Sequence, residues 1–286
     1  MAIRKLLLPL TGTAAGESAL VTALMVARKW DAHLRTLHVR VDARDVAPLA
    51  GEGLSGAMIE EMMAATEKES GERAMAVKTL FDRVVAREGV RITDEIEPGL
   101  SASFRLLTGR EEDLFAQRAR LADLSIIPHP EAPDEVSSSD ALHAVLFDSG
   151  RPILISPLAP PVSVGTRIAV AWNGTAESAA AVFAALPWLE NAEAVRVLSA
   201  LEYQRRGPAA EELVPYITLH GVQAEIATFR PVDKEVGAGL LAAAQEFGAD
   251  LLVMGAYSHS RLRQLILGGV TRHILEKAQL PVMMCR

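Results

Sequence analysis

Glycines and hydroxyl-bearing residues near the C-terminus have the spacing of a phosphate-binding loop. The segment Gly255-Ala256-Tyr257-Ser258 follows a buried-strand pattern, and Gly268-Gly269-Val270-Thr271 opens a predicted helix that runs to Ala278. Glycine lets a backbone approach a ligand closely, and the free N–H groups at a helix N-terminus favour an anion. The C-terminal part of the chain therefore carries a candidate phosphate site, although close packing of a helix on a sheet would also explain these glycines.

The composition is that of a globular protein, with neither a nucleic-acid-binding nor a membrane-spanning signature. Half of the 286 residues are hydrophobic, 23% are charged, and the net charge is −7. Residues 1–166 carry 18 Lys and Arg against 24 Asp and Glu, whereas residues 167–286 carry 11 against 12. There is no basic footprint for nucleic acid, and no apolar run is long enough for a bilayer. The acidic surface lies mostly away from the glycine motif, which suits an anionic ligand in the second half.

The N-terminus and the cysteine count both favour a cytoplasmic protein. The apolar run Leu6–Leu10 is too short for a signal peptide, is interrupted by Pro9, and precedes no small-residue cleavage site. A single cysteine, Cys285, excludes an internal disulfide and suits a reducing compartment. We expect Cys285 to be a small buried residue of the closing strand.

An internal repeat divides the chain into two halves. The matched segments are Arg4–Thr13 with Arg167–Thr175, Ala122–Ile127 with Ala249–Met254, and Arg151–Ser156 with Leu280–Cys285. The prolines of the segment Pro157–Gly165 suit a linker, because they cannot continue a helix or an interior strand. We therefore expect one domain at residues 1–157, a Pro-rich linker at 158–165, and a second domain at 166–286.

Within each half, short apolar runs alternate with helix-length periodic segments, which implies a parallel sheet covered on both faces. In the second half we expect strands at Ile168–Trp172, Ala194–Ala200, Gln223–Arg230, Leu251–Gly255 and Val282–Cys285, and helices at Ala176–Leu189, Ala209–His220, Val232–Phe247 and Thr271–Ala278. Ligands of such sheets bind beyond the strand C-termini, so the turn Asn173-Gly174-Thr175 and the Gly255 loop would face one crevice. The closing strands Ile153–Ser156 and Val282–Cys285 would expose an apolar edge if unpaired, and we expect the halves to pack through them.

The first half carries a longer excursion after its second strand. Residues 43–55 are predicted to form a loop, and Met58 to about Glu88 a long helix. Met58, Met62 and Met63 fall at helical spacing, and we expect them to face the core. The alternative is a soft, partner-binding face.

The repeat and the C-terminal motif together resemble the universal stress protein family in its tandem form. The nucleotide-binding pattern of that family is Gly, two residues, Gly, nine residues, then Gly and Ser or Thr. Gly255 and Gly268 match this pattern, whereas Ser258 and Gly269 replace its second glycine and its hydroxyl residue. The resemblance implies an α/β fold of two tandem five-stranded parallel sheets with helices on both faces. This is the adenine nucleotide alpha hydrolase-like fold, packed here as an intramolecular pseudo-dimer.

The same resemblance implies binding of ATP, ADP or AMP, with or without Mg²⁺, and little or no catalysis. The implied nucleotide-binding residues are Asn173, Gly174, Ala200, Gly255, Ser258, Gly268, Gly269, Val270 and Thr271. Asn173 stands where the family often has an Asp that contacts the nucleoside, and Thr271 is expected to replace the missing hydroxyl. The base would lie near Ala200. We expect no catalytic residue and no metal site, since the histidines form no close pair with ligand spacing.

The first half lacks the phosphate loop. Pro128 stands in the place of Gly255 and offers no N–H group, and Glu131 corresponds to Ser258. Ser139-Asp140 corresponds to Gly268-Gly269. Two carboxylates at this position would repel a phosphate, so we expect one nucleotide site per chain.

Other residues near the motif have several interpretations. Arg261 and Arg263 are equally consistent with surface solvation and with phosphate or partner contact, and His259 is best explained as a polar loop residue. Trp172 could stack on a base, although core packing is the better interpretation.

Three function classes follow from these features. The first is a cytoplasmic stress or signalling protein whose partners are an adenine nucleotide, another protein and a second tandem chain. The second is a nucleotide-free interaction protein that docks partners on the Met-rich helix and the long loop at residues 43–55. An adenylating or electron-transferring enzyme would need a His-x-x-His signature, a Ser-Gly-Gly loop or a flavin site, and the sequence has none of these.

Overall fold

The computed structural model describes residues 2–13, 15–40, 42, 55–130, 140–201, 207–257 and 269–286. The elements of the first half are β1 (Lys5–Pro9), α1 (Ala15–Trp30), β2 (His33–Arg40), α3 (Gly56–Arg87), β3 (Ser101–Thr108), α4 (Glu111–Ala119), β4 (Leu124–Ile127), α6 (Asp140–Asp148) and β5 (Ile153–Ile155). Those of the second half are β6 (Arg167–Ala171), α7 (Ala176–Glu190), β7 (Ala194–Ala200), α8 (Ala210–Thr218), β8 (Ala224–Phe229), α9 (Val236–Phe247), β9 (Leu251–Gly255), α10 (Gly269–Lys277) and β10 (Val282–Cys285).

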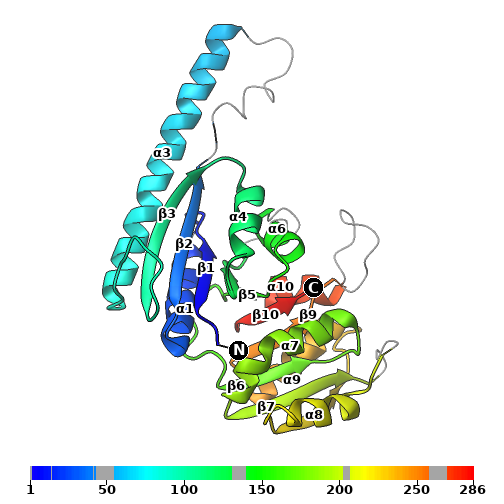
Figure 1. Cartoon of the computed structure of the whole chain (residues 1–286). Coiled ribbons are helices and arrows are strands. Elements are labelled where there is room, and N and C mark those ends of the chain that lie inside the picture. The colour runs from blue at the N-terminus through cyan, green and yellow to red at the C-terminus, as the bar shows by residue number, and fades with distance from the viewer. Residues whose placement is uncertain are drawn as a thin grey trace.

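The two expected five-stranded sheets join into one sheet of ten strands. Its order is β3-β2-β1-β4-β5-β10-β9-β6-β7-β8, so each half contributes five consecutive strands (Figure 1). Strands are parallel within each half, whereas β5 and β10 pair antiparallel, with Ile155 opposite Val282 and Ile153 opposite Met284. The predicted α/β fold and the predicted contact between the closing strands are therefore confirmed.

Helices cover both faces of this sheet, as fully apolar strands require. One hydrophobic core packs α1, α3, α7 and α8 against the sheet, and it contains Phe81 and Trp188. The opposite core packs α4, α6, α9 and α10, and it contains Phe115 and Phe247. Equivalent helices of the two halves thus lie on the same face, which is the arrangement that a two-fold axis through the β5–β10 seam produces.

The sequence repeat appears again in the hydrogen bonds that begin each sheet. The Asp123 carboxylate accepts from the backbone N–H groups of Arg4 and Lys5, both at 2.9 Å, at the start of β1. In the second half the Asp250 carboxylate accepts from the N–H groups of Thr166 and Arg167 at 2.9 and 2.8 Å. Each aspartate therefore ties the start of the first strand to the start of the fourth.

The observed elements of the second half follow the predicted ones closely. β7, β9 and β10 have the predicted bounds, and α9 differs most, because it begins at Val236 rather than at Val232. Asp233 and Lys234 adopt left-handed φ angles of 50° and 68°, and Val232 bridges to Glu235. A tight turn therefore occupies the predicted first turn of this helix.

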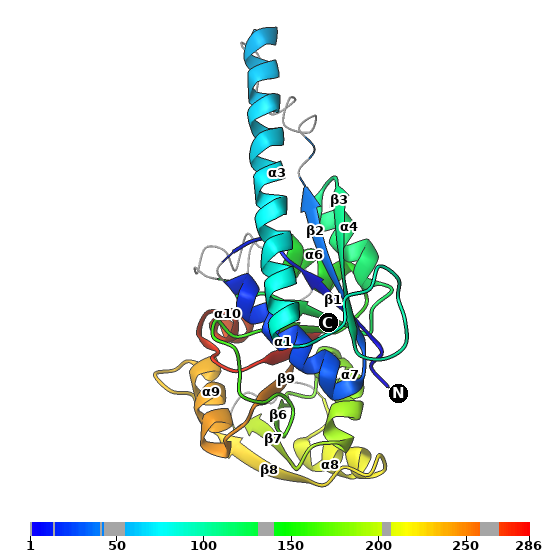
Figure 2. The same cartoon turned by 90° about the vertical axis from the view of Figure 1, so that its left-hand side faces the viewer.

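The long helix α3 extends far beyond the sheet (Figures 1 and 2). Its C-terminal half packs on the core through Val77, Phe81 and Val84, but no side chain of residues 56–73 is buried. Met58 is 49% exposed and Met62 39% exposed. The prediction that the methionine stripe faces the core is wrong, because the helix continues past the body against which it would pack.

Among the described residues, no helix is both long and apolar enough to cross a membrane.

Candidate functional site

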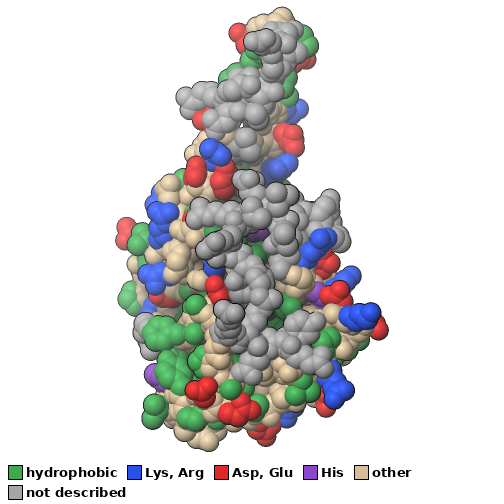
Figure 3. Space-filling model, turned by 90° about the vertical axis from the view of Figure 1, so that its right-hand side faces the viewer, with side chains coloured by type: hydrophobic (Ala, Val, Ile, Leu, Met, Phe, Trp, Pro, Cys, Tyr) green, Lys and Arg blue, Asp and Glu red, His purple; other side chains and the backbone are tan. Residues whose placement is uncertain are grey.

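The predicted site lies where the order of strands in the second half reverses. β6 has β9 on one side and β7 on the other, and all three strands are parallel. Ala171 is level with Met254 of β9 and with Leu198 of β7. The strand C-termini therefore bring Asn173 and Gly174 between Gly255 and Ala200, at the switch point where such sheets bind ligands. Basic and acidic side chains both lie on this side of the molecule (Figure 3).

The turn after β6 is held by its own side chains. Asn173 Oδ1 accepts from the backbone N–H and the hydroxyl of Thr175, at 3.2 and 2.9 Å. Thr175 in turn caps α7, with its Oγ1 accepting from the N–H of Ser178 at 3.4 Å. Within the described part of the chain, the amide nitrogen of Asn173 donates to no other residue. Asn173 thus offers donors, but not a carboxylate, toward the switch point.

Gly174 and Gly207 bring two loops of this edge into backbone contact. Gly174 has a φ of 73°, and a Cβ on Gly207 would lie within 2 Å of the Gly174 carbonyl oxygen. Next to this contact the Trp172 indole donates to the Pro208 carbonyl at 2.9 Å, and Trp172 is only 7% exposed. Trp172 is therefore a core residue, as its preferred interpretation predicted, and does not present a face to a base.

Gly255 is a glycine for a packing reason. A Cβ at this position would lie 2.5 Å from the backbone nitrogen of Ser178 and 2.6 Å from the carbonyl carbon of Glu177. The first turn of α7 therefore contacts the end of β9 so closely that no side chain fits. The packing explanation accounts for Gly255 without a ligand, and it also places the N-terminus of α7 at the switch point.

The second part of the motif opens α10 beside the end of β9. Thr271 Oγ1 accepts from the backbone N–H of Tyr257, at 3.5 Å, across the described ends of the loop. Thr271 is only 5% exposed, so its hydroxyl faces this bond rather than open solvent. Gly269 is exposed, with no atom within 4 Å of a Cβ built on it, and Val270 is partly exposed. The predicted site residues Ser258 and Gly268 lie outside the described residues, as do His259, Arg261 and Arg263.

The equivalent edge of the first half has a different lining. A Cβ on Gly12 would lie 2.9 Å from the Val77 side chain of α3. In the first half, therefore, α3 covers the turn that is equivalent to the Gly174 turn, which Gly207 contacts in the second half. His38, at the end of β2, donates from Nδ1 to the Leu10 carbonyl at 2.7 Å, and burial lowers its pKa. Pro128 follows β4, as predicted, while Glu131 and Ser139 lie outside the described residues and Asp140 begins α6.

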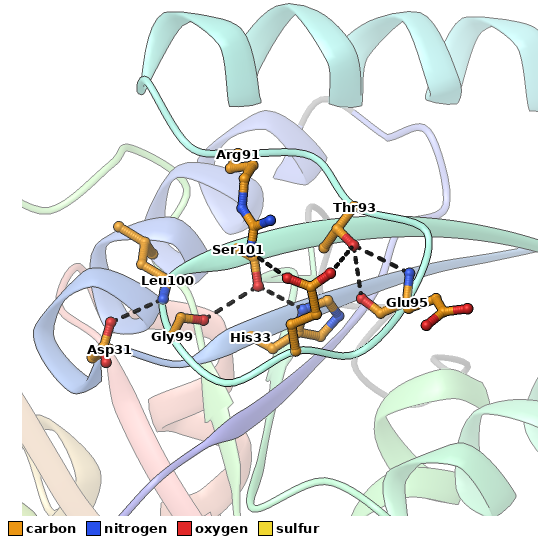
Figure 4. A network of polar contacts seen from close by, with 9 residues as sticks. Asp31, His33, Arg91, Thr93, Glu95, Gly99, Leu100 and Ser101 are labelled. Atoms are coloured by element: carbon orange, nitrogen blue, oxygen red, sulfur yellow. Dashed lines mark hydrogen bonds and ion pairs between the residues drawn. The ribbon is translucent and has the colours of Figure 1, made fainter.

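A buried polar cluster that sequence reasoning missed lies at the opposite end of the first half (Figure 4). His33 Nδ1 lies 2.9 Å from Ser101 Oγ, and Nε2 lies 2.7 Å from Ser103 Oγ. Since Ser101 donates to the Gly99 carbonyl, Nδ1 must be the donor to Ser101, and Nε2 accepts from Ser103. Burial, then the charges of Arg35 and Lys5, lowers the pKa of His33 to about 4. The cluster is closed on itself and serves packing.

Neither metal chemistry nor cysteine chemistry is supported by the described residues. No group of three or more His, Cys, Asp or Glu side chains in them could hold a metal ion. Cys285 is buried, as predicted, and this burial raises its pKa to about 12, so the reactive thiolate is disfavoured.

A ten-stranded sheet with a switch point in each half and helices on both faces defines a doubly wound α/β protein. Over nearly its whole length, the chain is similar to a universal stress protein from Archaeoglobus fulgidus DSM 4304. That match has a TM-score of 0.66 at 15% identity and covers 99% of this chain and 96% of the other. A protein of unknown function from Pseudomonas aeruginosa PAO1 gives a TM-score of 0.56 at 18% identity, with coverages of 99% and 92%. At these identities the similarity concerns the fold.

Sequence comparison gives a family match for the second half of the chain. Residues 166–286 match the model of the Universal stress protein family. A segment of 37 residues is 49% identical to a universal stress protein of Synechocystis sp. (strain ATCC 27184 / PCC 6803 / Kazusa), and it spans 13% of each chain. Residues 166–286 therefore match the universal stress protein family in sequence, and over its full length the chain has the fold of the Archaeoglobus fulgidus universal stress protein.

Proposed function

We propose that the second half, residues 166–286, binds an adenine nucleotide in a cytoplasmic stress or signalling role, with little or no hydrolysis. The observation that carries this proposal is the hydrogen bond between Tyr257 and Thr271, which holds the first turn of α10 at the end of β9. The N–H groups of that turn have no partner within the helix and favour an anion. We propose further that residues 1–157 and 166–286 act as two domains joined by the linker 158–165.

In this proposal the phosphates bind at the N-terminus of α10, where Gly269 and Val270 leave the backbone accessible. Gly255, Ser258 and Gly268 complete the loop. The nucleoside lies along the ends of β6 and β7, near Asn173, Gly174 and Ala200, with Mg²⁺ as a companion ion of the phosphates. The Asn173 amide would donate a hydrogen bond to the nucleoside, whereas an Asp carboxylate at the same position could only accept one. A ligand with acceptor groups at that position would therefore bind best.

Calorimetry with ATP, ADP and AMP, with and without Mg²⁺, tests the proposal on the whole chain. Gly269→Glu should lower the affinity at least tenfold by placing a carboxylate beside the phosphates, with little change in melting temperature, because the position is open. The matched control is Gly56→Glu, since Gly56 is also the first residue of a helix with nothing within 4 Å of its Cβ position. If the wild-type chain binds none of the three nucleotides, the proposal is wrong.

A second candidate function is partner docking on the projecting part of α3, residues 56–73. The specific observation is the exposure of Met58 and Met62 on a segment with no buried side chain. That segment carries five glutamates against one lysine and one arginine. We propose that its partner presents an apolar stripe flanked by basic side chains.

Paired variants test this docking role. Met58→Glu combined with Met62→Glu should abolish capture of any such partner. Met75→Glu should not, because Met75 is 66% exposed and lies on a different side of the same helix. If the double variant still captures the partner, residues 56–73 are not the docking surface. The same conclusion follows if capture by the wild type does not weaken as the ionic strength rises.

A further inference from the structure

Tyr257, two residues after Gly255 at the end of β9, is contacted by a helix of the first half. The Tyr257 hydroxyl lies 3.3 Å from His143 Nε2 on α6. The Tyr257 ring also packs on Phe147, one helical turn further along, with ring centroids 5.1 Å apart. Phe147 is covered on another side by Arg286, whose guanidinium lies 4.3 Å from the ring centroid. His143 and Tyr257 are 114 residues apart in sequence. The pairing of β5 with β10 joins the two halves and so brings them together.

Tyr257 is also the point at which the backbone of the loop turns. Its φ is 56°, a left-handed conformation that a bulky residue adopts only when its surroundings hold it there. The residue before it is fixed by a hydrogen bond from the N–H of Ala256 to the Cys285 carbonyl at 2.8 Å. Its own N–H donates to Thr271 in the first turn of α10. The side-chain contacts with α6 thus act on the residue whose N–H is hydrogen-bonded to α10.

The equivalent positions of α10 carry different side chains. In the repeat, Arg272 and Glu276 of α10 correspond to His143 and Phe147 of α6. Arg272 pairs with Glu276 on its own helix, Nε to Oε1 at 2.6 Å. The first half therefore places an imidazole and an aromatic ring against Tyr257, whereas the second half has an ion pair within one helix at the equivalent positions.

We propose that His143 and Phe147 are positioning residues for the nucleotide site of the second half and act through Tyr257. The identity of the ligand rests on the proposed nucleotide binding. The support of Tyr257 by α6 does not depend on that proposal. The imidazole fixes the tyrosine hydroxyl, and the phenyl ring fixes the plane of the tyrosine ring. Together they maintain the left-handed turn that sets the α10 N-terminus beside the end of β9. The half without a phosphate loop thereby contributes to the site of the half that has one.

Nucleotide affinity gives the first test. Tyr257→Phe and His143→Ala should each raise the dissociation constant of the tightest-binding adenine nucleotide about threefold to tenfold, the range expected for one lost hydrogen bond. His143→Gln should restore most of the affinity, since an amide can replace the imidazole as a hydrogen-bonding partner. The matched controls are Tyr216→Phe and His220→Ala, which alter a second tyrosine–histidine contact, with centroids 5.1 Å apart, at the end of α8.

Amide hydrogen exchange gives a second test that needs no nucleotide. In the unliganded chain, His143→Ala and Tyr257→Phe should accelerate exchange in peptides covering Gly269–Lys277, and His220→Ala should not. Unchanged exchange in both variants would overturn the inference, whatever the wild type binds. Binding by the wild type with the same dissociation constant in both variants would overturn it as well. If the wild type binds no nucleotide, only the proposed function fails, and the exchange rates still decide the positioning role.

Discussion

The junction after β4 in the first half and the junction after β9 in the second are equivalent in the repeat, yet they are built differently. After β9, the missing side chain of Gly255 allows the first turn of α7 to contact the backbone. Tyr257 has a left-handed φ angle, and its N–H donates to Thr271 of α10. After β4, Pro128 offers neither an N–H group nor that freedom of φ. The comparison shows that the two junctions differ in a backbone donor and in the φ angles open to them, although the strand order around them is the same.

The neighbouring edges differ in what covers them. Gly12 of the first half lies against Val77 of a 32-residue helix, whereas Gly174 of the second lies against Gly207, just before the nine-residue helix α8. A side chain of a long helix fills the first edge, and a backbone-to-backbone contact shapes the second. The first half has therefore used the position over its switch point for packing.

The largest expected effect tests the packing role of Gly255. Gly255→Ala should lower the free energy of unfolding by about 3–4 kcal/mol, because the new methyl would meet backbone atoms of α7, which cannot rotate away. Urea titration of the whole chain measures this. Gly269→Ala, where the space is open, should instead be neutral or more stable by up to about 1 kcal/mol. Equal losses in both variants would contradict the distinction between the two glycines.

A smaller effect is expected at the cluster around His33, which belongs to the first half alone. The folded-state pKa of about 4 lies below the ordinary value of 6.5, so the unfolded chain binds the proton first as the pH falls. Stability from this group is present above about pH 6.5 and is lost progressively toward about pH 4. Between about pH 7.5 and about pH 4.5 the loss should be roughly 2–3 kcal/mol.

Urea titrations at the two pH values measure this loss. His33→Gln should flatten the pH dependence by the same amount, whereas His220→Gln, at the exposed His220, should leave it unchanged. Every carboxylate is present in the wild type and in both variants, so the comparison removes only an imidazole. An equal slope for His33→Gln and the wild type would show that the ring is not held neutral.

The smallest expected effect is on α10. Arg272→Ala removes an ion pair with Glu276 that spans one turn of the helix, and Arg272 is half exposed. The free energy of unfolding should therefore fall by less than about 0.5 kcal/mol. A loss above about 1 kcal/mol in the same urea titration would mean that Arg272 supports more than its own helix, and the contrast with α6 would then weaken.

Much of the fold could be predicted from the sequence, because the repeat and the apolar strands are local patterns. The segments Ala194–Ala200, Leu251–Gly255 and Val282–Cys285 have the predicted bounds, and the closing strands pair as expected. Helical periodicity could not show that Met58 projects into solvent, since a pattern gives the direction of a face but not the presence of a neighbour.

The candidate site was predictable as a place, and less so as a set of contacts. Strand ends and glycines identify the edge that carries Asn173 and Gly255, because parallel strands end on one side of a sheet. That Gly255 meets α7, and that Tyr257 meets His143, depends on distances between elements far apart in the chain. Only a folded structure provides those distances, and the roles of the site residues stay predictions.

The seam between β5 and β10 has a consequence for how the two halves can change over time. In a dimer of identical chains, every substitution appears twice, so a damaged site is damaged in both subunits. Here the two halves are joined covalently, and dilution cannot separate them because the effective concentration of each for the other is fixed by the linker. Each half can therefore change independently of the other, as the 32-residue helix α3 of the first half illustrates. The antiparallel pairing of Ile153–Ile155 with Val282–Met284 keeps the two halves in one sheet, and their covalent link lets each half carry different substitutions.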